Sequence, residues 1–241
     1  MIARTAAVVE PGGVLGELAC APPLTLRQVH SDVPGRCELR LVGTAAGPLA
    51  GDDLSMSLRL RAGARATMRA TGASLAQGRG GGHGGGALSI RIDLADGSDL
   101  VADPGALIVC HGGRVDVRLE LALGLDVALD WRELIVLGRT GEPAGAATLS
   151  WDVTRLGRPV LRQFVDLTDP AWTAWPGLTA GRRVLACALL ADPAGTPRTV
   201  VASPTSVAQR LADGTLLVTV LGDDAAAASQ ELDDLCTRAW S

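Results

Sequence analysis

The sequence predicts a mostly-β protein that ends in one α-helix. Three stretches alternate apolar and polar residues with a period of two: "LSMSLRLRAG" from Leu54, "ALSIRIDL" from Ala87 and "RVDVRLELAL" from Arg114. Such alternation is typical of strands that bury one face. Turn signals such as Asp96-Gly97 and Asp213-Gly214 separate the apolar runs at short intervals, which favours many short strands.

The segment from about residue 223 to residue 240 has a different period. Its apolar positions are three and four residues apart, which predicts an amphipathic helix. These positions are Ala225, Ala228, Leu232, Leu235 and Ala239. Asp223 is the expected N-cap, and Arg238 lies in the last turn, where the helix dipole favours a cation.

Composition excludes several classes of protein. The 241 residues, 47% of them hydrophobic, are enough for one domain with a sizeable core, and we expect a single domain over residues 1–241. The net charge of −4 and the absence of a basic cluster argue against nucleic-acid binding. The chain contains no lysine, which excludes a Schiff-base mechanism and a Walker-type phosphate loop.

Cysteine usage and the N-terminal sequence bear on the compartment. The five cysteines are widely spaced in apolar stretches and form no CxxC pair, so we expect reduced thiols in a cytoplasmic protein. The sequence "MIARTAAVVEPGG" has no long apolar segment typical of a signal peptide. No run of about 20 apolar residues predicts a transmembrane helix.

A glycine-rich stretch, Gly78–Gly86, contains His83. It matches the G-x-G-x-x-G pattern, but the following residues read as a strand, whereas a dinucleotide site requires a helix there. A connector between two strands is the favoured interpretation. The alternative is a metal contact at His83. One imidazole on a glycine loop offers a single ligand, so such a contact would be transient and would need further ligands from elsewhere.

Cys110 and His111 are the most suggestive chemical pair. A thiolate and an imidazole suit a borderline divalent metal such as nickel or zinc. Neighbouring residues of a strand point to opposite faces, so both can bind one ion only in a turn, which the following Gly112-Gly113 permits. The alternative is that Cys110 is a core residue and His111 begins a loop.

The segment "DWRELIVLGRTGEPAG" (residues 130–145) places polar residues around an apolar run. Trp131 is expected in the core. Glu133 and Glu142 could either form ion pairs, with Arg139 available as a partner, or have a functional role. The loop from Leu167 to Gly181 contains Trp172 and Trp175, and we expect it to pack or to bind a partner.

No hydrolase, metalloprotease, calcium-binding or kinase motif is present. The residues alone therefore favour a β-rich binding or scaffold protein. Two alternatives are a small hydrolase that uses Cys110 and His111, and a generic β-sandwich binding module. A carbohydrate-binding module would expose aromatic side chains, yet the chain has no tyrosine and one phenylalanine, Phe164.

The order of several segments resembles the urease accessory protein D family (UreD/UreH). The similar segments are Gly47–Asp52, Ala62–Thr71, Pro104–Val109, Trp131–Glu142 and Ala208–Gly222. The resemblance covers most of Gly47 to Trp240. The chain differs from the family in its polyglycine insert and in Cys110-His111, where members often have an aromatic residue and a small polar turn.

The resemblance implies a non-enzymatic maturation factor with an elongated stacked-sheet scaffold, β-helix-like or sandwich-like. Such a protein binds urease apoprotein, a helical adaptor and a nickel-carrying GTPase, and assists nickel delivery without a tightly bound cofactor. We predict transient nickel contacts at Cys110, His111, Glu133 and Glu142, with His83 as an auxiliary contact. We predict partner contacts at Trp172, Trp175 and Arg139, and further contacts by the C-terminal helix.

Overall fold

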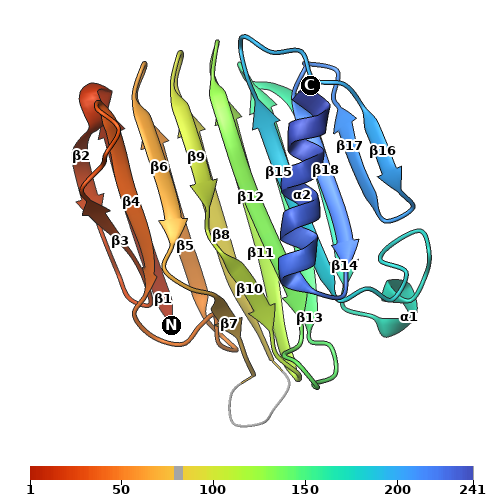
Figure 1. Ribbon diagram of the computed structural model, residues 1–241. Coiled ribbons are helices and arrows are strands. Elements are labelled where there is room, and N and C mark those ends of the chain that lie inside the picture. The colour runs from red at the N-terminus through yellow and green to blue at the C-terminus, as the bar shows by residue number, and fades with distance from the viewer. Residues whose placement is uncertain (79–83, 241) are drawn as a thin grey trace.

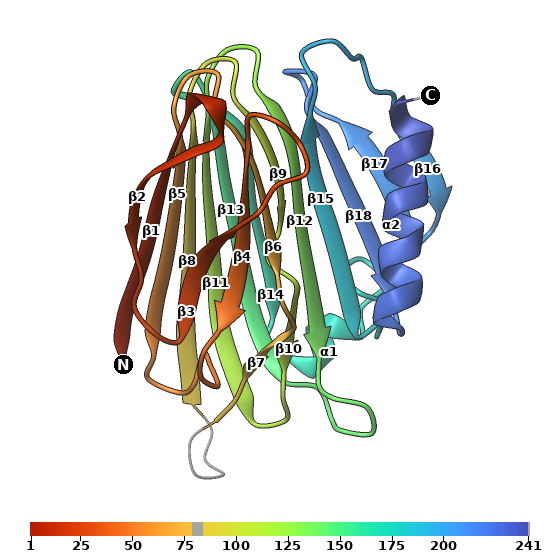
Figure 2. The ribbon, with the colours of Figure 1, turned by 60° about the vertical axis from the view of Figure 1, so that its left-hand side comes forward.

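Two β-sheets packed face to face form the framework of the computed structural model, which describes residues 1–78 and 84–240 (Figure 1). Figure 2 shows the long C-terminal helix on the outside of the molecule. The mostly-β prediction with a C-terminal helix is confirmed. Short η1 (Pro11–Gly13) and α1 (Pro170–Thr173) complete the regular elements.

Sheet A has seven strands. In spatial order they are β14 (Arg158–Leu167), β13 (Ala146–Arg155), β11 (Gly113–Leu123), β8 (Gly84–Leu94), β5 (Asp53–Leu60), β1 (Ile2–Glu10) and β2 (Val14–Ala19). The three alternating stretches of the sequence are β5, β8 and β11, as predicted. β8 begins at Gly84, so the end of the glycine-rich stretch belongs to a strand.

Sheet B has eleven strands. Nine follow in the order β16 (Val200–Ser203), β17 (Ser206–Arg210), β18 (Leu216–Gly222), β15 (Val184–Ala191), β12 (Ala128–Leu137), β9 (Asp99–Asp103), β6 (Arg65–Ala70), β4 (Arg36–Gly43) and β3 (Leu24–Val29). Two short strands lie off this path: β10 (Ala106–Val109) pairs with β12 and with β7 (Ser74–Ala76).

The chain passes from one sheet to the other and advances by one strand with each coil. In sheet A, β1, β5, β8, β11 and β13 are parallel neighbours. In sheet B, β4, β6, β9 and β12 are parallel neighbours. After β12 the pattern changes, because β15, β18, β17 and β16 add to sheet B in antiparallel fashion.

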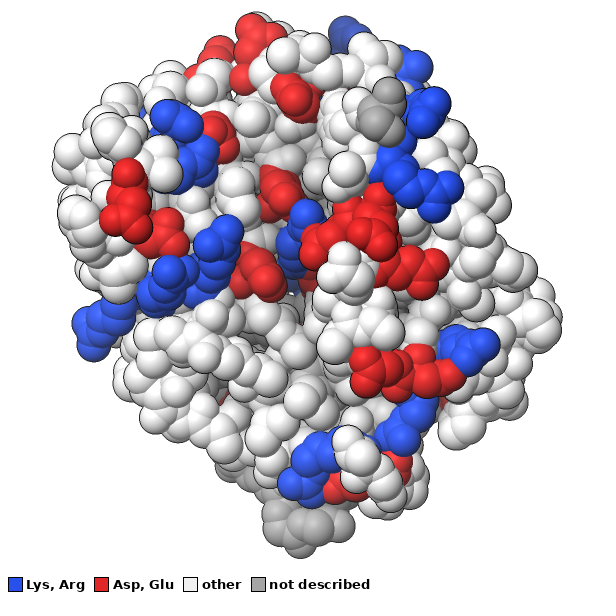
Figure 3. Space-filling view, in the orientation of Figure 1, with Lys and Arg blue, Asp and Glu red and all other residues white. Residues whose placement is uncertain are grey.

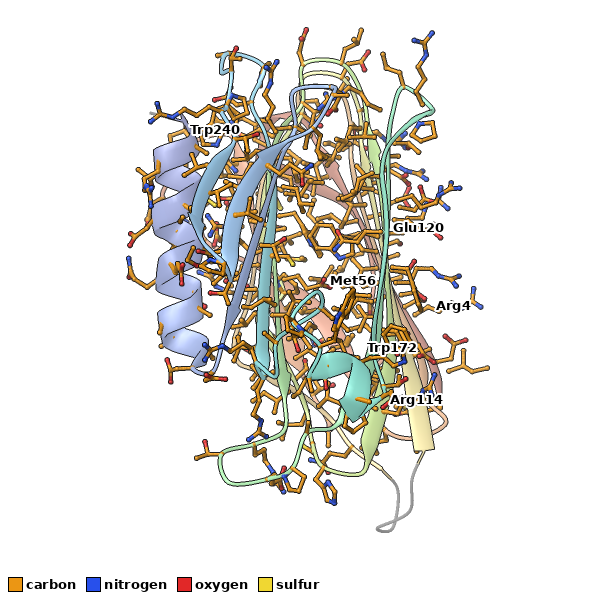
Figure 4. All side chains as sticks on the ribbon, turned by 90° about the vertical axis from the view of Figure 1, so that its right-hand side faces the viewer. Arg4, Met56, Arg114, Glu120, Trp172 and Trp240 are labelled. Carbon is orange, nitrogen blue, oxygen red and sulfur yellow. The ribbon has the colours of Figure 1, made fainter. Side chains whose placement is uncertain are left out.

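The main core lies between the sheets and explains the alternation. On β11, Val115, Val117, Leu119 and Leu121 are buried while the residues between them are exposed. Figure 4 shows the same division: Met56 lies between the sheets, and Arg4 and Glu120 point away from sheet A. Because one face of each parallel strand stays in solvent, these strands alternate, whereas parallel strands buried on both faces read as continuous apolar runs.

Helix α2 (Ala225–Trp240) covers the outer face of sheet B and forms a second core there. It packs on β18 and β15, so β15 is buried on both faces. The helix is capped by Asp224, whose carboxylate accepts the Ala227 N–H at 2.8 Å. The expectation of Asp223 as N-cap was wrong by one residue, because the helix begins at Ala225; Asp223 forms an ion pair with Arg182 instead. Acidic side chains gather over α2 in Figure 3.

No helix among the described residues is long and apolar enough to cross a membrane.

Candidate functional site

A tight turn after β10 separates the side chains of Cys110 and His111. The Cys110 N–H donates to the Ala76 carbonyl at 2.9 Å, and the Gly113 N–H donates to the Cys110 carbonyl at 2.9 Å. Cys110 is buried and His111 is exposed. Burial raises the pKa of the Cys110 thiol, which is the opposite of what a cysteine nucleophile requires.

Glu142 lies against the same turn. Its Oε2 accepts the backbone N–H groups of Arg139 at 3.2 Å and His111 at 3.4 Å, and its Oε1 accepts Arg139 Nε at 2.8 Å. The Arg139 side chain, together with these backbone donors, lowers the pKa of Glu142 to about 2. The carboxylate is therefore ionised at neutral pH and holds the β12–β13 loop to the His111 backbone.

Two glycines allow the backbones to meet at this corner. A Cβ on Gly113 would lie 2.7 Å from the Ala76 carbonyl oxygen, and a Cβ on Gly145 would lie 2.4 Å from the Val109 carbonyl oxygen. Any side chain at either position would force the segments apart.

A cleft of about 410 Å³ opens beside the turn, at one end of the space between the sheets. Its walls include His111, Arg114, Leu137, Leu167 and Thr173. Leu137 ends β12 in sheet B, whereas Arg114 and Leu167 belong to sheet A, so both sheets contribute. Figure 4 labels Arg114 and Trp172 at this end of the molecule.

Glu133 lies deeper, between the sheets. It is 6% exposed, and its Oε2 accepts Trp151 Nε1 at 2.7 Å. Burial raises the pKa of Glu133 to about 7, and the Trp151 hydrogen bond opposes the shift. The carboxyl group borders an apolar cavity of about 40 Å³, which also touches Met56 and Val117. Such a volume is enough for a few ordered waters at most.

The structure divides the predicted metal contacts into two groups. Cys110, His111 and Glu142 lie at the turn, beside the cleft. Val109, just before Cys110, pairs with Leu137 at the end of β12. Glu133 lies four residues before Leu137 on the same strand, which separates it from the turn by about 13 Å at 3.3 Å per residue. Over residues 1–78 and 84–240, no three His, Cys, Asp or Glu side chains are placed to hold a metal ion. His83 lies outside the described residues.

The predicted partner contacts are exposed. Trp172 and Trp175 are 59% and 56% exposed, and their rings meet edge to face with centroids 6.4 Å apart. Arg139 is also exposed, although Glu142 occupies its guanidinium. Sequence reasoning missed Trp151 as the partner of Glu133, although the alternation of "LSWDV" places that indole on the buried face of β13.

These features define a β-rich protein with a coiled two-sheet framework, an exposed aromatic pair and a cleft between the sheets. The family model described as UreD urease accessory protein matches residues 5–240. The chain belongs to the UreD urease accessory protein family.

Curated relatives agree with the family match. Urease accessory protein UreD 1 of Streptomyces griseus subsp. griseus is 34% identical over 83% of this chain and 76% of the relative. UreD 3 of the same organism is 31% identical over 92% of this chain and 89% of the relative. UreD 1 of Saccharopolyspora erythraea is 33% identical over 72% of this chain and 69% of the relative.

Proposed function

We propose that this chain is a non-enzymatic scaffold in urease maturation. It binds urease apoprotein, a helical adaptor and a nickel-carrying GTPase, and it assists the transfer of nickel to the urease active site. Family membership supports a role in urease maturation. The observation that carries the nickel step is the end of the framework, where His111 lines a cleft between the sheets and Glu142 accepts the His111 backbone N–H at 3.4 Å.

Nickel is the cargo of this scaffold and no resident cofactor is needed. Because affinity alone favours copper over nickel, controlled delivery depends on geometry and shielding. A site with few ligands suits brief contact followed by release. Glu133 is the nickel contact that lies deeper between the sheets, where burial shields it from solvent.

Partner contacts lie on exposed surfaces near the cleft. The Trp172–Trp175 pair is the docking site for the adaptor, because exposed aromatic side chains are typical anchors of protein interfaces. The chain works in the cytoplasm, which is supported by its five free cysteines.

The test is nickel loading of urease apoprotein by the parent chain and by a variant with Cys110→Ala, His111→Ala, Glu133→Gln and Glu142→Gln. We expect the variant to load at least tenfold less nickel. A control variant with His30→Ala, Glu17→Gln and Glu120→Gln removes one imidazole and two carboxylates elsewhere and should load normally. Loading at the parent level by the quadruple variant would overturn the assigned nickel contacts, and ester or amide turnover by the purified chain would contradict the non-enzymatic role.

A further inference from the structure

Sheet B is wider than sheet A at the C-terminal side of the molecule. β11 and β12 follow each other in the chain and lie in opposite sheets. Beyond β11, sheet A continues through β13 and β14, whereas beyond β12, sheet B continues through β15, β18, β17 and β16. The β16–β17 hairpin therefore extends past the last strand of sheet A.

The inner face of this hairpin continues the row of side chains that contains Glu133. Strand register joins Glu133 to Cys187, then to Thr219, Val207 and Val201. Glu133 and Cys187 are buried, and Thr219 and Val207 are half-buried. Val201 is 74% exposed. Helix α2 covers the opposite face, where Ala208 is buried. This row of side chains thus runs out of the core and ends in two valines, Val207 and Val201, that sheet A does not fully cover.

β14 is the edge strand of sheet A, and it faces the side of sheet B that carries the hairpin, across the side chains packed between the sheets. Figure 4 looks onto this side of the molecule. At one end, Arg155 Nε donates to Asp213 at 2.9 Å and joins the two sheets. At the other end, α1 packs against β14. Between these ends, the N–H and C=O groups on the free side of β14 have no neighbouring strand among the described residues.

The side chains of β14 restrict what can pair with it. Pro159 lacks an N–H, and the register shifts next to it, so the stretch available for pairing begins at Val160. On the outer face, Arg162 and Phe164 are exposed. Antiparallel pairing of two copies through β14 would bring both overhanging hairpins to the same face of the joined strands, which argues against a second copy as the occupant.

We infer that β14 and the overhanging β16–β17 hairpin together form a docking site for a single extended segment of a partner polypeptide. The segment adds to sheet A as a further strand, and its backbone hydrogen-bonds to residues 160–167. Its side chains alternate: apolar ones face Val207 and Val201, and polar ones lie on the outer face, where a carboxylate shares Arg162 with Asp152, whose Oδ2 accepts Arg162 Nη2 at 3.1 Å. The inference rests on the proposed function only for the proteins used in its test.

The test compares amide hydrogen exchange of the full chain alone and in complex with urease apoprotein, the adaptor or the GTPase. Strand addition ties up the outward N–H groups of β14, so exchange in residues 160–167 should slow at least tenfold in one of these complexes. Docking through side chains alone would leave these amides unchanged and would overturn the inference.

Surface variants supply the second measurement. Val201→Asp and Arg162→Glu should each reduce recovery of that partner at least tenfold. Two matched controls should bind normally: Val14→Asp, which alters a 56% exposed valine on β2 at the opposite edge of sheet A, and Arg118→Glu, which alters an exposed arginine on β11. Normal binding by Val201→Asp would overturn the inference and leave the proposed function standing. Failure of the parent chain to bind any of the three proteins would overturn both.

Discussion

The Trp151 indole donates to the Glu133 carboxylate at 2.7 Å and so joins the two sheets through the core. Trp151 lies on β13 of sheet A, and Glu133 lies on β12 of sheet B. A buried carboxyl group with one neutral donor and no cation is costly to ionise, which accounts for its raised pKa.

This environment predicts that stability depends on pH. The pKa of Glu133 is about 7 in the folded chain, against an ordinary value of 4.5. The folded state therefore keeps a proton that the unfolded state loses, and this contribution to stability is complete below pH 4.5 and disappears as the pH rises through 7. The loss is on the order of 3 kcal/mol.

Urea unfolding at several pH values between 5 and 8 measures this effect. Glu133→Gln stays neutral throughout, so the stability of the parent relative to this variant should fall as pH rises. The surface substitution Glu120→Gln serves as the control and should run parallel to the parent. A constant difference between the parent and Glu133→Gln would contradict the assignment.

Trp151→Phe should destabilise the chain more than Trp131→Phe. Both indoles are buried, but Trp151 Nε1 binds Glu133, whereas Trp131 Nε1 has no hydrogen-bond partner among the described atoms. The two substitutions remove a similar volume, so the difference between their effects isolates the lost hydrogen bond. We expect Trp151→Phe to lower the free energy of unfolding by about 1–3 kcal/mol more than Trp131→Phe. Equal losses would show that the bond contributes nothing.

The ion pair between Arg155 and Asp213 should stabilise the contact between the sheets. Arg155 also donates to Thr215 Oγ1 at 3.3 Å and to the Gly124 carbonyl at 3.4 Å. Arg155→Ala should cost about 1–2 kcal/mol in urea unfolding. Arg162→Ala removes a more exposed pair with Asp152 on a neighbouring strand and should cost less than about 0.5 kcal/mol.

Gly145→Ala should disturb the turn that holds His111. Its new methyl group would lie 2.5 Å from the Cys110 carbonyl oxygen, so the β12–β13 loop must shift. We expect a loss of about 2 kcal/mol or more in thermal unfolding. Gly72→Ala meets nothing within 4 Å and is the matched control. Similar melting temperatures for the two variants would show that the loop adjusts freely.

Replacing Trp172 and Trp175 by alanine should weaken co-purification with the adaptor at least tenfold, because their exposed rings would no longer anchor the interface. Neither ring is buried, so thermal stability should change little. Leu125→Ala removes another large exposed apolar side chain, away from this loop and from β14, and tests whether the loss is specific to the tryptophans. Unchanged recovery of the adaptor by the double variant would reject this docking site.

Local periodicity in the sequence determined the elements and their buried faces. Val115, Val117, Leu119 and Leu121 alternate with charged residues, and a strand with this pattern can bury only one set. The spacing of Leu232 and Leu235 likewise fixed the buried face of α2. Trp131 was predicted in the core and lies there.

Only the tertiary structure decided what the polar residues among these elements do. Glu133 and Glu142 are equivalent in the sequence, nine positions apart, yet their pKa values shift in opposite directions. The row from Glu133 through Cys187 and Thr219 to Val201 joins strands distant in the chain. Strand register depends on how the completed sheets pack. The pKa of a carboxyl group depends on its burial and on the hydrogen-bond donors that this packing places around it. Neither is determined by the neighbouring residues in the sequence.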